Sequence, residues 1–577
     1  MSGKLSVLIV GGYGTFGGRL VELIENDSRL TLIVAGRSRA RADAFVKTRG
    51  AAKAQLVAAA FDRDGDVDGQ LAKLRPEILV DASGPFQAYG EGQYKIVEAC
   101  IAKGIHYLDL ADGSDFVAGV SAFDAAARAA GIFVLSGVSS FPVLTAATVR
   151  RLSSDIRRID AIFGGIAPSP YAGVGENVIR AIASYAGRPT ALKRGGAWSL
   201  GHPFTDQIRF TIAPPGALPL KSTLFSLVDV PDLRALTELW PDAASIWMGA
   251  GPVPEILHRA LIGFAWLVRL RIVPSLSPLA PLMFFATNRV RWGEHRGGMF
   301  VAVNGTTANG VSVQRSWHLL AEGDDGPLIP SMAVAAIIQK LLSGEAPSTG
   351  ARAATRDLEL EDYEKLFASR TITTGIREQA SGGAPLYERV LGAAWLRLPA
   401  EIRAIHSVHS HLIAEGRADV ERGRGALVQL IAWMMAFPKA GRDLPLTVQF
   451  TAKDGVETWT RDFAGQRFFS RQFAGRGRSE FLLCESFGPL KFAMALVARN
   501  RELHLVLRRW SFLRVPMPMW LCPRSQAFES VEGGRFRFYV EIRIPLIGLI
   551  VRYKGWLNCD NAQAGASPIT QVSYGYS

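Results

Sequence analysis

The first apolar run of the chain ends in a cluster of glycines. Five of the six residues in Leu5–Val10 are apolar and three are β-branched, which predicts a buried strand. The sequence GGYGTFGG follows at residues 11–18, and residues 19–24 (RLVELI) then begin an amphipathic helical pattern. The chain therefore opens with a strand, a glycine-rich turn and a helix.

The same alternation of short apolar runs and helical stretches continues to residue 142. Apolar runs at residues 30–35, 55–60, 78–82, 105–110 and 133–136 predict strands, and residues 40–46, 90–103 and 121–130 predict helices. Strands that alternate with helices form a doubly wound parallel sheet. Residues 1–142 are thus expected to be an α/β Rossmann domain.

Residues 143–378 have a mixed pattern, which predicts an α+β domain. Helices are expected at residues 143–150, 177–185 and 332–342, and strands at 301–304 and 311–320. The alanine-rich face of the 332–342 helix is expected to pack on the first domain. A substrate pocket at the domain interface and a homodimer contact are the two roles expected of this domain.

Residues 256–285 are unusually apolar for a surface segment. The longest uninterrupted apolar run, residues 260–268, has nine residues, and Arg259, Arg269 and Arg271 flank it. About 20 apolar residues are needed to span a bilayer, so a transmembrane helix is not expected. A buried interface helix and a basic, aromatic helix that contacts a membrane surface both fit the pattern.

The last third of the chain, residues 385–560, changes to period-two alternation. Residues 386–413 predict helices broken by Pro399, and turn signals such as Asp454-Gly455 recur after them. In Arg535–Ile544 the apolar residues Phe536, Phe538 and Val540 share one face and charged residues share the other. We expect an antiparallel β-rich domain, curled or closed over an apolar face that is either core or a lipid-like ligand site, and a tail at 561–577.

Charge is unevenly distributed over the 577 residues. The net charge is +13, and residues 381–577 hold 26 Lys and Arg against 16 Asp and Glu. A basic domain of this kind suits nucleic acid, an anionic membrane, an acidic ligand or simply a solvated arginine-rich face. Because no nucleic-acid motif accompanies the charge, no nucleic-acid partner is expected.

The four cysteines are too widely spaced for a metal site or a disulfide framework. Cys100, Cys484, Cys522 and Cys559 form no C-x-x-C pair, which is typical of reduced thiols in a cytosolic protein. Met1-Ser-Gly-Lys leads straight into the first strand and leaves no room for a signal peptide. His406, His409 and His411 lie close in sequence, but no acidic ligand is arranged beside them, and no metal is expected.

The glycine turn has the spacing of a dinucleotide-binding fingerprint. Gly12, Gly14 and Gly17 fit G-x-G-x-x-G between a strand and a helix, so Tyr13, Thr15 and Phe16 would lie beside a pyrophosphate at the helix N-terminus. About 20 residues later, where NAD-preferring domains place an acidic residue, the chain has Gly36 and Arg37. Arg37, with Ser38 as a second donor, would pair with a 2′-phosphate, which favours NADP(H) over NAD. The alternative is that Arg37 only precedes the next helix.

Further candidates lie at the carboxyl edge of the predicted sheet. Asp62 would bind the adenine or cap the turn at residues 62–65. The sharp break made by Ser83, Gly84, Pro85 and Phe86 would face the ligand. The weak catalytic candidates are Tyr89, Asp109 and Asp112. Each of these three has a structural alternative: packing on the turn, accepting hydrogen bonds at a strand end, or capping a helix.

The first 145 residues resemble a known family. The stretches GGYGTFG, GPFQAYGEG, CIAKGIHYLDLADG and AGIFVLSGVSSFP are similar to the saccharopine dehydrogenase-like oxidoreductases, and residues 386–557 resemble a bacterial domain of unknown function that is often fused to them. The resemblance implies a Rossmann domain followed by an α+β substrate domain. It also implies that Gly12, Gly14, Gly17 and Arg37 contact the cofactor, and that residues 83–86 flank its nicotinamide side.

The resemblance does not supply a substrate. No clear match is visible to residues that would bind the carboxylates of saccharopine, and the apolar segments favour a hydrophobic or lipid-derived substrate. The first hypothesis is therefore an NADP(H)-dependent oxidoreductase, cytosolic or peripheral at the inner face of the membrane. A non-catalytic NADP(H)-sensing, lipid- or membrane-binding protein is the alternative, and a basic nucleic-acid binder is the third hypothesis.

Overall fold

The computed structural model describes residues 4–379 and 383–558. The chain forms two compact units. The first comprises residues up to Ile212 together with Thr223–Gly375, and the second comprises Ala213–Ser222 and the residues from Ile376 onward. The expected tail at 561–577 and Cys559 lie outside the described residues.

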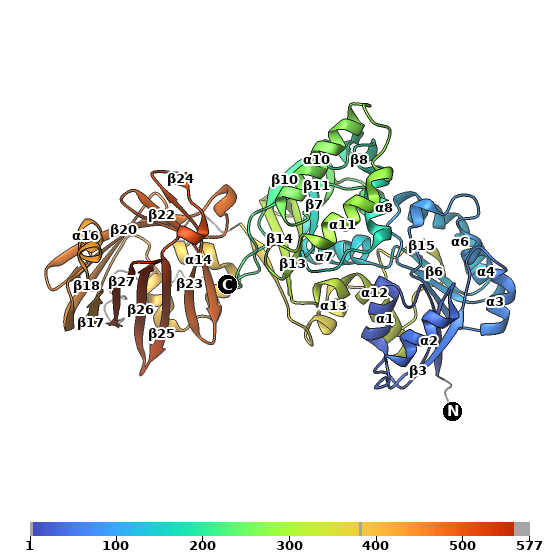
Figure 1. The fold of residues 1–577 in the computed structure, drawn as a ribbon, viewed down its shortest axis with the longest axis horizontal. Coiled ribbons are helices and arrows are strands. Elements are labelled where there is room, and N and C mark those ends of the chain that lie inside the picture. The colour runs from blue at the N-terminus through green and yellow to red at the C-terminus, as the bar shows by residue number, and fades with distance from the viewer. Residues whose placement is uncertain (1–3, 380–382, 559–577) are drawn as a thin grey trace, which may run out of the picture. The chain divides into compact units, whose positions relative to one another are not determined.

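A seven-stranded parallel sheet begins the first unit (Figure 1). Its order is β15-β6-β5-β4-β1-β2-β3, and each neighbouring pair is parallel, as Leu5 opposite Leu30 illustrates. The strands are β1 (Leu5–Val10), β2 (Leu30–Gly36), β3 (Gln55–Ala60), β4 (Ile78–Asp81), β5 (His106–Asp109), β6 (Phe133–Ser136) and β15 (Gly350–Ala353). The predicted doubly wound α/β domain is confirmed.

Helices connect these strands. They are α1 (Thr15–Ile24), α2 (Arg39–Lys47), α3 (Val67–Leu74), α4 (Lys95–Lys103), α5 (Ser114–Gly119) and α6 (Asp124–Ala129). The helix expected from Arg19 begins four residues earlier, at Thr15, because Gly14 is the N-cap and the glycines at 17 and 18 lie inside the first turns. Thr15 and Phe16 therefore stand at the helix N-terminus.

The seventh strand comes from a segment that the sequence pattern did not assign to this sheet. β15 pairs in parallel with β6, with Ala351 opposite Val134. The whole of residues 143–378 was expected to form the second domain. The structure instead returns the chain to the first sheet at Gly350 before it re-enters the second.

The second sheet is mixed, as expected for an α+β domain. Its order is β10-β11-β12-β7-β13-β14-β16; β12 and β7 are parallel, whereas β7–β13 and β13–β14 are antiparallel. The strands are β7 (Ile156–Ala167), β10 (Gln207–Phe210), β11 (Thr223–Leu227), β12 (Ser245–Ala250), β13 (Arg296–Thr307), β14 (Ser312–Glu322) and β16 (Ile372–Glu378). A separate hairpin joins β8 (Thr190–Arg194) to β9 (Ala197–Gly201).

The helices of this part include the one that contacts the Rossmann domain. They are α7 (Thr145–Leu152), α8 (Glu176–Tyr185), α9 (Asp232–Leu239), α10 (Glu255–Arg269), α11 (Ala280–Arg289), α12 (Ile329–Leu342) and α13 (Leu360–Phe367). α12 lies against α1 (Figure 1), and the Ser331 hydroxyl donates to the Phe16 carbonyl at 3.0 Å. The expected packing of this alanine-rich helix on the first domain is confirmed.

Helices α10 and α11 bury few of their apolar side chains. On α10 only His258, Ala265 and Val268 are buried, whereas Ile256, Phe264 and other large apolar residues are exposed. α10 is therefore not the buried interface helix that was one of the two alternatives for residues 256–285. In the described parts of the chain, we find no helix with the length and apolarity that crossing a membrane requires.

The second unit contains an antiparallel sheet that closes on itself. Ten strands form the ring β17-β18-β19-β20-β21-β22-β23-β25-β26-β27, because β22 pairs with β23 and β27 pairs with β17; the short β24 extends from β23. The strands are β17 (His411–Arg422), β18 (Gly441–Lys453), β19 (Val456–Phe463), β20 (Gln466–Ala474), β21 (Leu483–Phe487), β22 (Leu490–Arg499), β23 (Glu502–Phe512), β24 (Val515–Pro516), β25 (Arg524–Glu532), β26 (Arg535–Ile544) and β27 (Gly548–Leu557).

The alternation read from residues 535–544 fits this sheet. β26 spans those residues, and Phe536, Phe538 and Val540 belong to the core inside the ring. α14 (Leu386–Leu391) and α15 (Ala400–His406) precede the ring, and α16 (Ala426–Met434) lies between β17 and β18. The helical expectation for residues 411–413 was wrong, because these residues pair with β18 at the start of β17.

His406 is the innermost of the three histidines near that boundary. It is fully buried on α15, and its Nε2 lies 2.6 Å from a Glu529 carboxylate oxygen. Across residues 4–379 and 383–558, no three His, Cys, Asp or Glu side chains are arranged to hold a metal ion.

Candidate functional site: a nucleotide cradle that opens into a large cavity

The glycine turn after β1 leaves no room for side chains. A Cβ added to Gly17 would lie 2.3 Å from the Gly11 carbonyl oxygen, and one added to Gly12 would lie 2.8 Å from the Ile9 oxygen. Gly11 itself has φ +75°, a conformation that favours glycine. The backbone can therefore turn sharply and place the N-terminus of α1 at the open edge of the sheet, where its free N–H groups favour an anion.

Tyr13 organises the end of the neighbouring strand β2. Its hydroxyl accepts a hydrogen bond from the Ser38 N–H at 3.1 Å, and its ring occupies the space that a side chain at position 36 would need, with the hydroxyl 2.6 Å from a Cβ built there. The Arg41 guanidinium lies 5.5 Å from the centre of the Tyr13 ring. Arg37 comes directly after Gly36, and its side chain is exposed at the cavity wall. The chain thus has a guanidinium where an acidic residue would select NAD.

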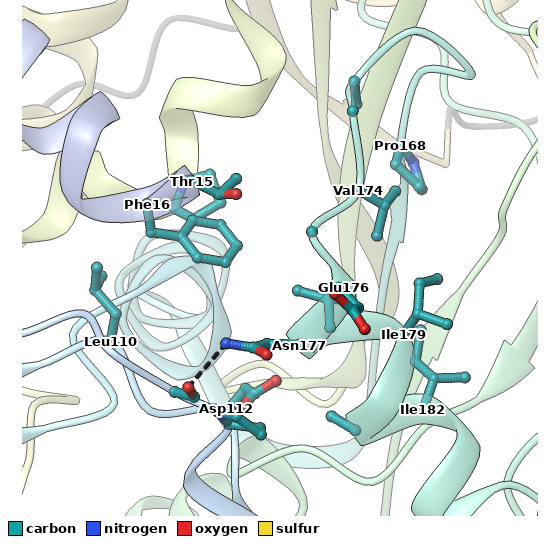
Figure 2. A pocket seen from close by; sticks show the side chains of 18 of the residues that line it. Thr15, Phe16, Leu110, Asp112, Pro168, Val174, Glu176, Asn177, Ile179 and Ile182 are labelled. Carbon is teal, nitrogen blue, oxygen red and sulfur yellow. Dashed lines mark hydrogen bonds between the residues drawn. The ribbon is translucent and has the colours of Figure 1, made fainter. Parts of the chain in front are cut away.

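The cradle opens into one large cavity of about 1600 Å³ (Figure 2). Thr15 and Phe16 of α1 lie on one side of it, and Val174, Ile179 and Ile182 lie on the other. Ligand pockets typically have volumes of about 300–1,000 Å³, so the cavity has room for a dinucleotide and a second molecule.

The far wall of the cavity is apolar and comes from α8, α10 and α11. Phe264 and Leu282 line the cavity and are also exposed at the protein surface, so they form an apolar rim. The other large aliphatic side chains from these three helices that line the cavity are Val178, Ile179, Ile182, Leu257, Leu261 and Met283. Few polar groups there could anchor a highly charged substrate.

Three polar side chains connect the end of β4 to the cavity. The Ser83 hydroxyl lies 2.5 Å from an Asp81 carboxylate oxygen and 2.9 Å from the Tyr89 hydroxyl. Asp81 is buried, and burial raises its pKa; burial also raises the pKa of Tyr89, whose ring stacks under the Arg63 guanidinium. Tyr89 and residues 83–86 all line the cavity, and the Gly84 carbonyl accepts a hydrogen bond from Asn177 of α8 at 2.9 Å (Figure 2).

Two acidic candidates from the sequence, Asp62 and Asp109, are not among the residues that line the cavity. Asp109 is fully buried at the end of β5, where one oxygen accepts the N–H groups of Ala111 and Gly137 at 2.9 and 2.7 Å; burial raises its pKa to about 7. Asp62 accepts the Asp64 N–H at 3.1 Å. Both geometries match the structural alternatives, a strand-end acceptor for Asp109 and a turn cap for Asp62. Asp62 is exposed between the lining residues Phe61 and Arg63, so its contact with the adenine stays a prediction.

Asp112 does face the cavity, and the second domain places two further groups near it. The Asp112 carboxylate accepts a hydrogen bond from Gln87 at 3.0 Å; it is accessible from the wide cavity, but the surrounding walls and then the charge of Asp229 raise its pKa. Tyr185 of α8 also lines the cavity, and its pKa is raised by burial and by the charges of Asp112 and Asp229. Sequence reasoning missed Tyr185 and Asp229, which carry no motif.

These features define a class of site. The turn around Gly17 leaves no space for a side chain. Arg37, Ser38 and Arg41 line the cavity after the end of β2, and residues 83–86 line it after the end of β4. This is the arrangement that binds dinucleotides in Rossmann folds, at the edge where the strand order reverses between β1 and β4. The residues present therefore fit a dinucleotide, and the first unit belongs to the class of dinucleotide-binding α/β proteins.

Two parts of the chain match known domain families. Residues 7–135 match the saccharopine dehydrogenase NADP binding domain, and residues 398–557 match a domain of unknown function, DUF4166. The chain thus combines a saccharopine dehydrogenase-like N-terminal domain, with a nicotinamide dinucleotide as its cofactor, and a C-terminal domain to which no function is assigned. No curated protein matches the chain.

Several solved structures are similar to parts of the chain. Apo saccharopine dehydrogenase (L-Glu forming) from Saccharomyces cerevisiae is 14% identical, covers 65% of this chain and 100% of its own, and gives a TM-score of 0.46. Biliverdin reductase from Synechocystis, in complex with biliverdin and NADP+, is also 14% identical, with 63% and 96% coverage and a TM-score of 0.28. The WlbA dehydrogenase from Thermus thermophilus, in complex with NAD, is 11% identical, with 64% and 93% coverage and a TM-score of 0.27.

Proposed function

We propose that the protein is an NADP(H)-dependent oxidoreductase that acts on a hydrophobic, lipid-derived substrate rather than on saccharopine. The observation that carries the proposal is the continuity of one cavity from the glycine turn and Arg37 to the apolar walls of α8, α10 and α11. A cofactor site and an apolar substrate site that share one cavity allow the two molecules to meet.

The cofactor would supply or accept a hydride, and the protein has to position the substrate and manage one proton. In this proposal the backbone of residues 83–86 flanks the nicotinamide. The hydrogen bond from Asn177 to the Gly84 carbonyl holds α8 beside that backbone segment. Asp112 holds the proton. Its pKa is raised, first by burial and then by the charge of Asp229, and its carboxyl group faces the cavity, where it could exchange a proton with a bound substrate. Asp229 helps to keep that proton in place.

Arg37 would provide the preference for NADP(H) over NAD. Its guanidinium has no hydrogen bond or ion pair with any residue in the described ranges, so it is available for a 2′-phosphate. Ser38 is less available, because its hydroxyl caps α2 by accepting from the Arg41 N–H at 3.3 Å and its own N–H donates to Tyr13.

The test is turnover of defined substrates by the full-length protein. NADPH labelled with deuterium at C4 is mixed with medium-chain enals or with long-chain aldehydes. In a separate reaction, saccharopine is mixed with NADP+. The products of both reactions are analysed by mass spectrometry. Deuterium in a lipid product and no reaction with saccharopine would support the proposal. Binding of NADPH without turnover of any lipid carbonyl or enoyl compound would refute catalysis and support the alternative, a non-catalytic NADP(H)-sensing protein that binds lipid or membrane.

The surface of α10 and α11 gives the proposal a route for substrate entry. Ile256, Trp266, Leu270 and Phe285 are exposed there, beside the apolar rim formed by Phe264 and Leu282. Arg259, Arg269 and Arg271 flank these side chains, which suits the surface of an anionic bilayer. We propose that this face makes peripheral contact with such a bilayer and admits the substrate from it.

Vesicle flotation tests the membrane contact. The protein should float with phosphatidylglycerol vesicles and less with phosphatidylcholine vesicles, and the double variant Trp266→Ser, Phe285→Ser should lose most of this binding. Trp198→Ser is the control, because it removes a tryptophan on β9 that is 55% exposed, compared with 40% for Trp266. Equal binding by the double variant and the wild type would contradict the proposed surface.

A further inference from the structure

The closed sheet of the second unit has one place where neighbouring strands separate. β23 and β25 pair only through Leu503 with Glu529 and His504 with Phe528, whereas β23 pairs with β22 along its whole length and β25 does so with β26. Among the described residues, none of β23 after His504 pairs with β25. At the other end of β23, the short β24 pairs with Ser511 and Phe512, so the stretch that pairs with neither β25 nor β24 covers residues 505–509. The short helix η8 (Met519–Leu521) follows β24. The ring therefore has a slot in its wall.

A cavity of about 130 Å³ lies inside the ring behind this slot. Leu505 and Leu507 of β23 and Ser525 and Ala527 of β25 line it, so the strands that border the slot also border the cavity. The other walls are mainly aromatic and aliphatic: Phe450, Trp459, Phe492, Met494, Phe536, Phe538 and Val540. Its volume is close to that of an engineered apolar cavity of about 150 Å³ that binds benzene.

The opposite end of the cavity is closed by the helices that precede the ring. Tyr387 of α14 and Ile405 of α15 are buried there, and both line the cavity. Tyr387 donates to Gln472 at 3.0 Å, and Gln472 donates to Glu485 at 3.1 Å. These buried side chains cover the cavity on the side of α14 and α15, and the slot is the interruption of the strand pairing that borders it.

Charge at the inner end restricts the chemistry of the ligand. Two carboxylates, Glu485 and Glu529, line the cavity together with one guanidinium, Arg461. Arg461 already faces Glu485 at 3.7 Å and donates to Ser470 at 3.0 Å, while Glu529 faces His406. A ligand carboxylate placed among these groups would meet an excess of negative charge in a poorly solvated site, whereas a hydroxyl or carbonyl group would not.

The outer side of the slot is apolar. The segment between β23 and β25 exposes Leu513, Val515, Met519, Leu521 and Trp520, the last with 74% of its surface accessible. Apolar side chains clustered at the mouth of an apolar cavity are typical of a ligand entrance.

We propose that the interior of this closed sheet binds an apolar chain with an uncharged hydroxyl or carbonyl end, which enters between β23 and β25. The cavity, the slot and the carboxylate-rich inner end support this site independently of the oxidoreductase proposal. A closed sheet of eight strands is just wide enough to hold one small ligand, so ten strands leave sufficient width.

Photo-crosslinking on the full-length protein tests the site and distinguishes it from the cavity of the first unit. An octanol that carries a diazirine group should label peptides from β23, β25 or β26, and unlabelled 1-octanol should suppress that labelling at a concentration about tenfold lower than octanoate does. Labelling confined to residues before 376, or stronger competition by octanoate, would overturn the proposal.

Two variants sharpen the result. Ala527→Trp fills the cavity and should reduce labelling of these strands about tenfold, whereas Gln526→Trp, at the adjacent exposed position, should not. Glu485→Gln removes one negative charge and should narrow the difference between octanol and octanoate. Undiminished labelling of Ala527→Trp, or an unchanged preference in Glu485→Gln, would refute the assigned cavity and its charge selectivity; the wild-type labelling map remains decisive if Ala527→Trp does not fold.

Discussion

Replacement of Arg37 by alanine should weaken binding of NADPH and leave binding of NADH unchanged. Arg37 lies directly after β2, exposed at the cavity wall, and its side chain makes no hydrogen bond or ion pair within the ranges that the structure describes. The substitution therefore removes a guanidinium without breaking an internal contact. Any loss of affinity can be assigned to the nucleotide.

The expected magnitude follows from the exposure of the site. A hydrogen bond to a charged group contributes about 1.5–3 kcal/mol, and an exposed pair lies at the lower end of that range because water and salt screen it. A loss of about 1.5 kcal/mol corresponds to a Kd for NADPH that is about tenfold higher. The difference between NADPH and NADH should also shrink as the salt concentration rises.

Fluorescence titration of the full-length protein with NADPH and with NADH measures both constants. The four values for wild type and Arg37→Ala form a cycle that isolates the energy between Arg37 and the 2′-phosphate. Arg39→Ala is the matched control, because Arg39 pairs with Asp43 at 3.1 Å and does not line the cavity. Equal weakening of both nucleotides, or no change for NADPH, would refute the assignment of Arg37.

Three further predictions concern the first unit. Gly17→Ala forces a Cβ to within 2.3 Å of the Gly11 oxygen, so it should cost about 1–3 kcal/mol in thermal unfolding and abolish NADPH binding, whereas Gly50→Ala, with open space around it, should do neither. The pKa of Asp109 is raised to about 7 from an ordinary 3.8, so the wild type loses stability as pH rises from about 4 to 7. Asp109→Asn should flatten this dependence, and at pH 8 its free energy of unfolding should exceed that of the wild type by up to about 4 kcal/mol, which thermal unfolding measures. A pH profile parallel to that of the wild type would contradict this prediction. Asp112→Asn should lower kcat about a hundredfold with an unchanged Kd for NADPH, and full activity in steady-state assays would exclude Asp112 as the proton donor.

Local patterns were sufficient where the physics is local. The glycines at 12, 14 and 17 follow an apolar strand, and the structure places them between β1 and α1 because each bare backbone position there is sterically required. The alternation in residues 535–544 likewise predicted β26, since period two places one face in a core whatever the partner strands are.

Other features could not be read from neighbouring residues. β15 has the sequence GARA, which lacks β-branched residues, and it is a strand only because β6 offers an edge to pair with. Asp112 was a candidate on its own, but Asp229 and Tyr185 join it from segments more than 70 residues away. Asp109 and Asp112 look equivalent in sequence; only burial separates a strand-end acceptor from a group that faces the cavity.

The sequence by itself determined the doubly wound sheet, the nucleotide cradle and the basic residue after β2, because short-range sterics and periodicity specify all three. Tertiary structure alone decided that the cradle and an apolar wall share one cavity, and that ten strands of the second unit close into a ring with a slot. Both outcomes depend on pairings between residues distant in the chain, whose free energy comes from burial that no local pattern records.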